Sequence, residues 1–185
     1  LIRLNAFDEI HVEKTKSTLG QTSIHLLQEL TEFQVPEEPD LTGLNSHLRP
    51  YQEIGVRWLW FLYHHGLSGI LSDDMGLGKT HQTMGLIASI DNNKKKLLNP
   101  TKKHFLVVCP TSVIYHWQEK LALFLPGLKV CTFHGSSRSL HEFHKEYDIL
   151  LTSYGIWRIE NEFLSKFPFE LAIFDEIQIA KNHHS

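Results

Sequence analysis

A glycine-rich segment directly before a helical stretch constrains this chain most. Residues 73–80 read Asp-Asp-Met-Gly-Leu-Gly-Lys-Thr, and they follow an apolar run at Gly69 to Ser72 that we interpret as a strand. Glycines let the backbone curl so that successive N–H groups point at an anion, and the helix expected from about Lys79 to Ile90 directs its positive end there. Lys79 adds a mobile positive charge, and the Thr80 hydroxyl can ligate Mg²⁺. The segment therefore predicts a phosphate-binding turn.

The match to the strict phosphate-loop pattern is incomplete. The pattern G-x-x-x-x-G-K-[ST] has a glycine where this chain has Asp73. The alternative is a tight turn between a strand and a helix, with Lys79 facing solvent. The strand expected before the segment and the helix expected after it favour the phosphate loop.

A second chemical signal follows a later apolar strand, Leu171 to Phe174. Asp175 and Glu176 come directly after it. Two acids at the end of such a strand put one carboxylate beside Mg²⁺ and the next where it can polarise an attacking water. We expect Asp175 on the metal side and Glu176 as the general base. A solvated turn is the alternative for an isolated Asp-Glu pair.

Apolar runs that alternate with helical stretches predict the fold. Helices are expected over Tyr51–His64, near Tyr154–Phe163, and in a stretch whose apolar face consists of Val113, Ile114, Trp117, Leu121, Phe124 and Leu125. Residues 91–103 are expected to form an exposed loop. Besides Gly69–Ser72, short strands are expected at Phe105–Cys109, Val130–Phe133, Ile149–Thr152 and Leu171–Phe174. This alternation indicates an α/β fold with a mostly parallel sheet covered on both faces. Ligands should then bind where the strands end.

Charge and proline content divide the chain into an acidic extension, residues 1–45, and a lobe, residues 46–185. The formal net charge is -3, of which residues 1–50 contribute -4 (four Lys/Arg minus eight Asp/Glu) and the rest +1 (fourteen minus thirteen). The extension is expected to hold a short strand or two, an amphipathic helix, and a linker at Val35–Leu41. A near-neutral lobe implies that any nucleic-acid binding uses a local face. Because the chain starts with Leu1, we expect it to be part of a longer protein.

Composition argues against several other classes. No apolar run approaches the roughly 18 residues that cross a bilayer, so we expect no membrane partner. Cys109 and Cys131 lie in apolar, strand-like surroundings, which indicates buried free thiols and a reducing, intracellular compartment. The 13 histidines are scattered, so a histidine-held metal site is not expected.

Five segments, in this order, are similar to the first half of the motor of the Swi/Snf family. They are Leu48-Arg-Pro-Tyr-Gln52, Asp74-Met-Gly-Leu-Gly-Lys-Thr80, Val108-Cys-Pro-Thr-Ser112 with Trp117, Leu151-Thr-Ser-Tyr-Gly155 and Asp175-Glu-Ile-Gln178. Members of this family are ATP-dependent translocases on double-stranded DNA, in helicase superfamily 2. The resemblance implies a three-layer RecA-like P-loop NTPase lobe, and the Asp-Glu-Ile-Gln variant resembles the bacterial branch.

The resemblance also implies roles in binding ATP and Mg²⁺. Gln52 would read the adenine edge, with Arg49 and Tyr51 shaping the pocket, although an exposed polar position on a helix is the alternative for Gln52. Gln178 would hydrogen-bond the groups that couple the site to its surroundings. Thr80 and Asp175 would hold Mg²⁺. The segment around the phosphates would comprise Asp74, Met75, Gly76, Leu77, Gly78, Lys79 and Thr80.

Two further segments would contact the DNA backbone through small hydroxyls and backbone N–H groups. Their residues are Pro110, Thr111, Ser112, Thr152, Ser153 and Tyr154. For Thr111 and Ser112, capping of the next helix is the alternative, and one residue can do both. The lysines at 94–96, 102 and 103 have two interpretations. They form either a patch that binds phosphate groups or a solvated loop.

The function that we expect is that of the N-terminal ATPase lobe of a translocase that remodels protein–DNA complexes. Its partners would be double-stranded DNA, a second RecA-like lobe in cis and DNA-bound protein complexes, in the nucleoid or the nucleus. That second lobe would supply an arginine finger, so residues 1–185 alone should hydrolyse ATP slowly or not at all. The alternatives are a single-domain P-loop NTPase or kinase and a non-catalytic nucleic-acid-binding module.

Overall fold

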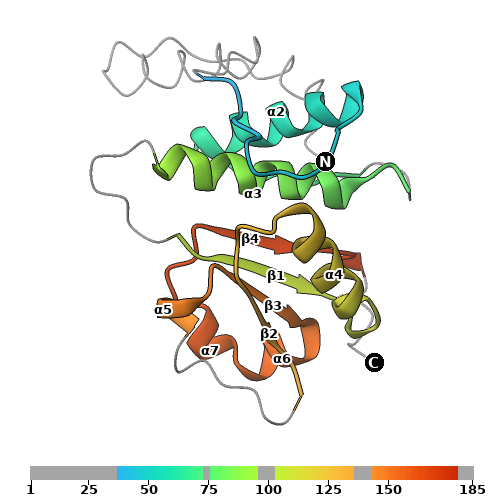
Figure 1. Ribbon diagram of the computed structural model, residues 1–185. Coiled ribbons are helices and arrows are strands. Elements are labelled where there is room, and N and C mark those ends of the chain that lie inside the picture. The colour runs from blue at the N-terminus through green and yellow to red at the C-terminus, as the bar shows by residue number, and fades with distance from the viewer. Residues whose placement is uncertain (1–36, 73–75, 96–102, 136–142, 179–185) are drawn as a thin grey trace, which may run out of the picture. The chain divides into compact units, whose positions relative to one another are not determined.

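The computed structural model describes residues 37–72, 76–95, 103–135 and 143–178 (Figure 1). In these ranges the chain forms two compact units, one of residues 37–39 and Leu48–Gln82 and one of Asp40–His47 and residues from Thr83 onward. The strand and helix expected before the linker lie outside the described residues, as do Asp74 and Met75. The predicted boundary between residues 45 and 46 stays a prediction.

Helix α2 (Pro50–His64) is the main element of the first unit. Pro50 occupies the first helical turn, where its fixed φ suits the helix and its missing N–H costs nothing. The side-chain oxygen of Gln52 accepts the N–H of Arg49 at 2.9 Å, which satisfies a backbone donor at the helix start. Val56, Trp60 and Phe61 are buried, so the helix is fixed by its apolar face.

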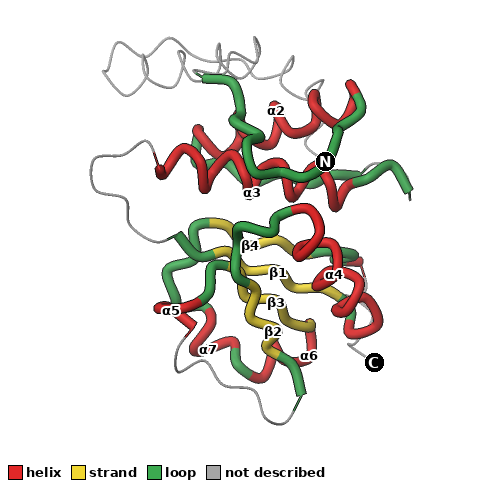
Figure 2. The backbone as a smooth tube through the Cα atoms, in the orientation of Figure 1, coloured by secondary structure: helices red, strands yellow, loops and turns green. Residues whose placement is uncertain are grey.

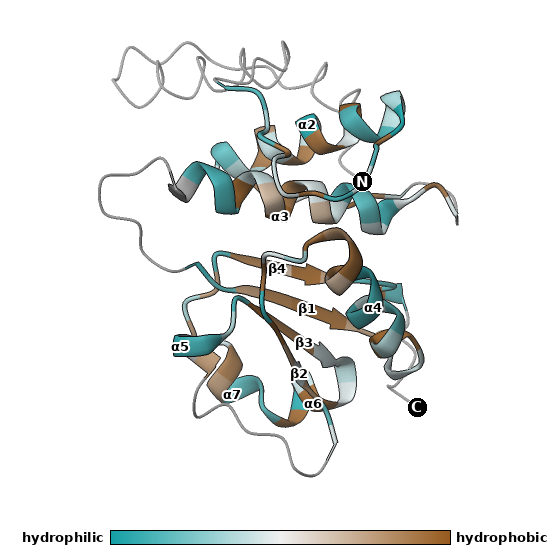
Figure 3. Cartoon of the chain, in the orientation of Figure 1, coloured by the Kyte–Doolittle hydropathy of each residue, from teal (hydrophilic) through white to brown (hydrophobic). Residues whose placement is uncertain are grey.

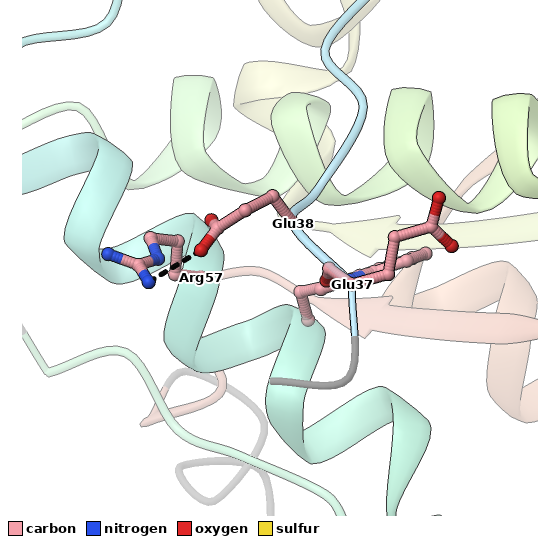
Figure 4. A network of polar contacts seen from close by, with 4 residues as sticks. Glu37, Glu38 and Arg57 are labelled. Carbon is pink, nitrogen blue, oxygen red and sulfur yellow. Dashed lines mark hydrogen bonds and ion pairs between the residues drawn. The ribbon is translucent and has the colours of Figure 1, made fainter. Parts of the chain in front are cut away.

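Two contacts hold Glu37 and Glu38 to helix α2. The indole Nε1 of Trp60 donates to the carbonyl oxygen of Glu37 at 2.8 Å, and Nη2 of Arg57 lies 2.6 Å from Oε1 of Glu38 (Figure 4). The Arg57–Glu38 side chains are 52% and 67% exposed, so their ion pair contributes little to stability. The buried ring of Trp60 is therefore the stronger anchor.

The run Gly69 to Ser72 forms no strand, contrary to the prediction. The chain leaves α2 through Gly66, whose φ is 64°. Gly69 then passes so close to α2 that a Cβ there would lie 3.0 Å from the ring of Trp58 and would collide with Leu62. Gly69 thus lies against the helix, whereas Ile70 stays 57% exposed. An apolar run of four residues was too short to distinguish these two environments.

The second unit contains a four-stranded sheet in the order β2-β3-β1-β4 (Figure 2). All three pairings are parallel. The strands are β1 (Phe105–Cys109), β2 (Val130–Phe133), β3 (Ile149–Ser153) and β4 (Leu171–Phe174). The four strands predicted for these positions are confirmed, with β3 one residue longer than expected.

Burial follows the strand order. Every residue of the central strands β1 and β3 is buried, whereas the edge strands β2 and β4 are partly exposed. Because neighbouring residues of a strand point to opposite faces, unbroken burial means that both faces of β1 and β3 are covered. Figure 3 shows β1 and β3 as largely hydrophobic bands.

Short helices cover one face of this sheet. Helices α5 (Phe143–Glu146), α6 (Tyr154–Ile159) and α7 (Asn161–Leu164) supply buried side chains to a cluster with residues of β1, β2 and β3. The single helix predicted near Tyr154–Phe163 is therefore two helices, and the hydroxyl oxygen of Ser153 caps the first by accepting the N–H of Ile156 at 3.3 Å.

The helix after β1 begins differently from the prediction. A 3₁₀ turn, η2 (Thr111–Val113), leads into helix α4 (Ile114–Phe124). Neither Thr111 nor Ser112 caps it, because no side chain makes the cap hydrogen bond of either element. The turn is closed by the backbone instead, with the N–H of Val113 donating to the carbonyl of Pro110 at 3.0 Å. Capping by these two hydroxyls was wrong.

Helix α3 (Lys79–Lys95) is longer than predicted, so residues 91–95 are helical and not part of a loop. Every residue from Met84 to Ile90 is buried. Near the end of the helix, Nδ2 of Asn92 donates to the carbonyls of Asp40 and Thr42 at 2.9 and 2.6 Å, within the second unit. In the described ranges, no helix has the length and apolarity needed to span a membrane.

Candidate nucleotide site and its carboxylates

The glycine loop adopts the backbone conformation that its sequence requires. Gly76 and Gly78 have φ of 87° and 80°, in the left-handed region that disfavours residues with a Cβ. The carbonyl of Gly78 accepts the N–H groups of His81 and Gln82 at 2.9 and 3.2 Å, so helix α3 starts directly after it. Lys79 and Thr80 are the first two residues of that helix.

Two side chains from the start of α2 hold this loop by a single carbonyl. Nε2 of Gln52 and the hydroxyl of Tyr51 each donate to the carbonyl oxygen of Leu77 at 3.1 Å. A Cβ at Gly78 would collide with the Gln52 amide, whereas one at Gly76 would meet nothing within 4 Å. Gly78 is thus required both for its φ and for the close approach of α2.

Gln52 is only 7% exposed, so the alternative of an exposed polar position on a helix is wrong. Both ends of its amide are engaged, the oxygen by the N–H of Arg49 and the nitrogen by the Leu77 carbonyl. An adenine would have to compete for these bonds. The sequence did not reveal this link, because Gln52 and Leu77 lie 25 residues apart and only the fold brings them together.

In the second unit, Asp175 lies where β4 ends beside β1. Phe174 pairs with Val108, and the N–H of Asp175 donates to the Val108 carbonyl at 2.9 Å, which extends the parallel ladder by one bond. Cys109 of β1 pairs with Ser153 of β3, so the ends of three strands meet at one edge. Asp175 is therefore at the edge where ligands bind in such sheets.

Two buried donors contact Asp175. Nε1 of Trp117 donates to its carboxylate Oδ2 at 2.8 Å, and the hydroxyl of Tyr154 donates to its carbonyl oxygen at 2.7 Å. Trp117 is 2% and Tyr154 7% exposed. These two contacts were not predicted.

Two neighbours of Asp175, the thiol of Cys109 and the phenol of Tyr154, are neutral groups. Burial, and next the charge of Asp175, raise the pKa of the Cys109 thiol to about 12. Burial raises the pKa of Tyr154 to about 12 as well, followed by the charges of Asp175, Cys109 and Glu176. A protonated thiol and a protonated phenol next to two carboxylates leave a negative edge, which favours a cation.

Glu176 has a φ of 50°, the only positive φ at a non-glycine residue among those described. This conformation costs a residue with a Cβ about 1 to 2 kcal/mol and is common at functional sites. Nε2 of Gln178 donates to Oε2 of Glu176. The predicted general base and the predicted coupling residue are thus direct partners.

The predicted DNA-contact residues fall into two groups. Thr111 and Ser112 are exposed, and Pro110 is half-buried. Thr152, Ser153 and Tyr154 are buried, and each hydroxyl already bonds within the protein. The three buried side chains do not reach the surface, so a DNA contact from this segment would have to come from its backbone groups.

The donor chemistry suits Mg²⁺ better than softer metals. No group of three or more His, Cys, Asp or Glu that could hold a metal ion occurs within residues 37–72, 76–95, 103–135 and 143–178. Mg²⁺ needs no such group, because it keeps several waters and is bound by one or two carboxylates together with substrate phosphates. Within the second unit, the carboxylate of Asp175 fits this mode, and in the first unit the hydroxyl of Thr80 is an oxygen donor of the same kind.

A parallel sheet whose last strand ends in two acids, together with a glycine loop that opens a helix, defines an α/β lobe of the RecA-like class. The family model described as SNF2-related domain matches residues 51–185. The chain belongs to this family.

Curated relatives are similar over most of this chain. It is 38% identical over 148 residues to TATA-binding protein-associated factor mot1 of Schizosaccharomyces pombe, covering 75% of this chain and 8% of that protein. It is 34% identical over 190 residues to the putative ATP-dependent helicase/translocase YwqA of Bacillus subtilis, covering 100% of this chain and 20% of that protein. The chain thus spans a small part of each relative.

Two solved structures are also similar to this chain. The Sulfolobus solfataricus SWI2/SNF2 ATPase core in complex with dsDNA has a TM-score of 0.68 and 33% identity, over 80% of this chain and 30% of that chain. The Sulfolobus solfataricus SWI2/SNF2 ATPase core domain has a TM-score of 0.62 and 32% identity, over 74% of this chain and 27% of that chain. The RecA-like α/β fold of this family is therefore confirmed.

Proposed function

We propose that residues 46–185 form the ATP-binding N-terminal lobe of a Swi/Snf-type motor that translocates on double-stranded DNA and remodels protein–DNA complexes. One observation carries this proposal: Gly76 and Gly78 have left-handed φ immediately before a 17-residue helix that begins with Lys79 and Thr80. Membership of the SNF2-related family supports it, as does the likeness to an ATPase core solved with dsDNA.

The loop residues would bind the phosphates of ATP. Left-handed glycines turn backbone N–H groups toward one side, and the first N–H groups of a helix lack partners within the helix. Lys79 would neutralise phosphate charge, and Gln52, with Arg49 and Tyr51, would select adenine. We also assign Asp74 and Met75 to this phosphate-binding segment, because they directly precede Gly76 in the sequence.

The carboxylates would carry the hydrolytic chemistry. Asp175 and the Thr80 hydroxyl would hold Mg²⁺, which when bound neutralises charge on the phosphate oxygens. Glu176 would accept a proton from the attacking water, and Gln178 would hold the Glu176 carboxylate through its amide N–H. The left-handed φ of Glu176 sets the direction of that carboxylate.

DNA would be bound through its backbone and not through its bases. The exposed hydroxyls of Thr111 and Ser112, with Pro110, are the side-chain candidates, and the segment Thr152–Tyr154 would contribute backbone groups. The remaining ATPase core, which in the relatives lies outside the matched segment, is the proposed partner in cis. It would supply an arginine finger.

Replacement of Lys79 tests this function directly in the intact protein. We expect Lys79→Ala to weaken binding of a fluorescent ATP analogue about 10- to 100-fold, the equivalent of a charge-assisted hydrogen bond, and to abolish DNA-stimulated hydrolysis. Lys166→Ala is the control, because the Lys166 side chain is 73% exposed and makes an i, i+4 ion pair with exposed Glu162. Wild-type affinity in Lys79→Ala would overturn the proposal. If the wild type hydrolyses ATP at the same rate with and without DNA, the result would favour a single-domain NTPase or kinase.

A further inference from the structure

Asp175 is fixed by three hydrogen bonds to three different segments of the second unit. Its N–H donates to Val108 of β1 at 2.9 Å, its carbonyl accepts the hydroxyl of Tyr154 at 2.7 Å, and its Oδ2 accepts the indole N–H of Trp117 at 2.8 Å. The first two bonds set the position of its backbone. The third sets the orientation of its carboxylate.

The contact with Trp117 has a specific chemical consequence. An indole N–H is a donor only, so it engages one carboxylate oxygen and cannot accept a bond in return. A hydrogen bond to an ionised acceptor is also stronger than one between neutral groups. Trp117 is 2% exposed, so solvent does not offer its N–H an alternative acceptor. The bond therefore holds Oδ2 and leaves Oδ1 for another ligand.

We propose that Trp117 and Tyr154 are positioning residues that orient Asp175 toward a divalent cation. The inference rests on the proposed function, in which Asp175 lies beside Mg²⁺. Residues that hydrogen-bond a metal ligand restrict its rotamers, and their replacement typically lowers metal affinity or activity about 10- to 100-fold. Trp117 acts on the carboxylate, and Tyr154 acts on the backbone that carries it.

A purely structural role is the competing explanation, since both rings are buried. Trp157 provides a matched control, because its indole ring packs edge-on against Phe174, the neighbour of Asp175, with ring centroids 5.5 Å apart. Trp157→Phe removes the same atoms as Trp117→Phe, from a half-buried ring beside Phe174. No hydrogen bond from Trp157 to Asp175 is involved.

The test measures metal binding without turnover. The intact protein, saturated with a non-hydrolysable ATP analogue, is titrated with Mn²⁺, and free Mn²⁺ is followed by electron paramagnetic resonance. We expect Trp117→Phe to raise the half-saturating Mn²⁺ concentration about 10-fold or more and Tyr154→Phe to raise it by a smaller factor. Trp157→Phe should stay close to the wild type. Circular dichroism confirms that each variant is folded.

Each result decides between the explanations. Wild-type Mn²⁺ affinity in folded Trp117→Phe, or an equal loss in Trp157→Phe, overturns the positioning role. If Trp117→Phe does not fold, Tyr154→Phe, which loses one hydroxyl, decides in its place, and wild-type affinity there overturns the inference. Asp175→Asn separates this inference from the proposed function. If Asp175→Asn loses Mn²⁺ affinity and the Trp117 and Tyr154 variants do not, only the positioning role is overturned. If Asp175→Asn binds Mn²⁺ as the wild type does, the assignment of Asp175 as a metal ligand is overturned as well.

Discussion

The amide nitrogen of Gln52 donates to the carbonyl oxygen of Leu77 at 3.1 Å, which ties the start of helix α2 to the glycine loop. The amide oxygen of the same side chain accepts the N–H of Arg49 at 2.9 Å. One residue therefore stabilises both the helix start and the loop that we propose binds phosphate. A nucleotide that engages Gln52 would act on both elements.

Removal of the Gln52 amide should weaken nucleotide binding. We expect Gln52→Ala to lower ATP affinity about tenfold. Loss of a buried hydrogen-bonding group, which leaves its partners without that bond, costs about 1 to 3 kcal/mol. Tyr51→Phe should have a smaller effect, since Tyr51 is 39% exposed. Calorimetric titration measures both, with Gln118→Ala on the exposed side of α4 as the control. An ATP affinity in Gln52→Ala equal to that of the control would contradict the role of this amide.

Alanine at Gly78 should be more damaging than alanine at Gly76. Both have positive φ, which costs a residue with a Cβ about 1 to 2 kcal/mol, but only at Gly78 would the Cβ collide with Gln52. Denaturant unfolding should show the larger loss of stability in Gly78→Ala. Gly127→Ala is the control, since no atom lies within 4 Å of its added Cβ and its φ is not positive. Equal stability of the Gly78 and Gly76 variants would show that the close approach to Gln52 is unimportant.

Asn92 should stabilise the second unit measurably. Its Nδ2 donates to the carbonyls of Asp40 and Thr42, and the side chain is 8% exposed. Asn92→Ala leaves these carbonyls without that donor, so the free energy of unfolding should fall by about 1 to 3 kcal/mol. Asn161→Ala, at an exposed position in α7, should change it by less than about 0.5 kcal/mol. Urea unfolding compares the two, and similar values would contradict this role of Asn92.

Both cysteine thiols should react slowly with alkylating reagents in the folded protein. Burial raises the pKa of Cys131, and burial followed by the charge of Asp175 raises that of Cys109 from 9.0 to about 12. Because the thiolate is the reactive form, labelling of Cys109 should keep accelerating as the pH rises above 9 instead of levelling off. Mass spectrometry of Cys131→Ala isolates the reaction of Cys109. A labelling rate equal to that of the denatured protein would contradict the burial of this thiol.

Local patterns predicted the elements that depend on short stretches of sequence. Phe105–Cys109 is continuously apolar because β1 is buried on both faces, and Gly76 and Gly78 mark a turn that no residue with a Cβ adopts easily. Asp175 and Glu176 could be placed at a strand end because β4 stops directly before them.

Features that depend on distant partners could not be predicted. The bond from Trp117 to Asp175 spans 58 positions and follows from how α4 packs near the end of β4. The hydroxyls of Thr152 and Tyr154 were expected to face DNA, but they are buried and bonded to the Phe133 and Asp175 carbonyls. The run at Gly69–Ser72 forms no strand, and Gly69 approaches α2 more closely than a residue with a Cβ could, which hydropathy does not reveal.

The central claim is that this lobe binds ATP and uses Glu176 to activate water, and Glu176→Gln tests it most directly. The substitution preserves shape and removes the basic carboxylate. In the intact protein with double-stranded DNA, we predict unchanged ATP affinity and a hydrolysis rate lower by a factor of about 10² to 10⁴. Glu162→Gln, whose side chain is 90% exposed, should behave as the wild type. Hydrolysis by Glu176→Gln at the wild-type rate would contradict the account.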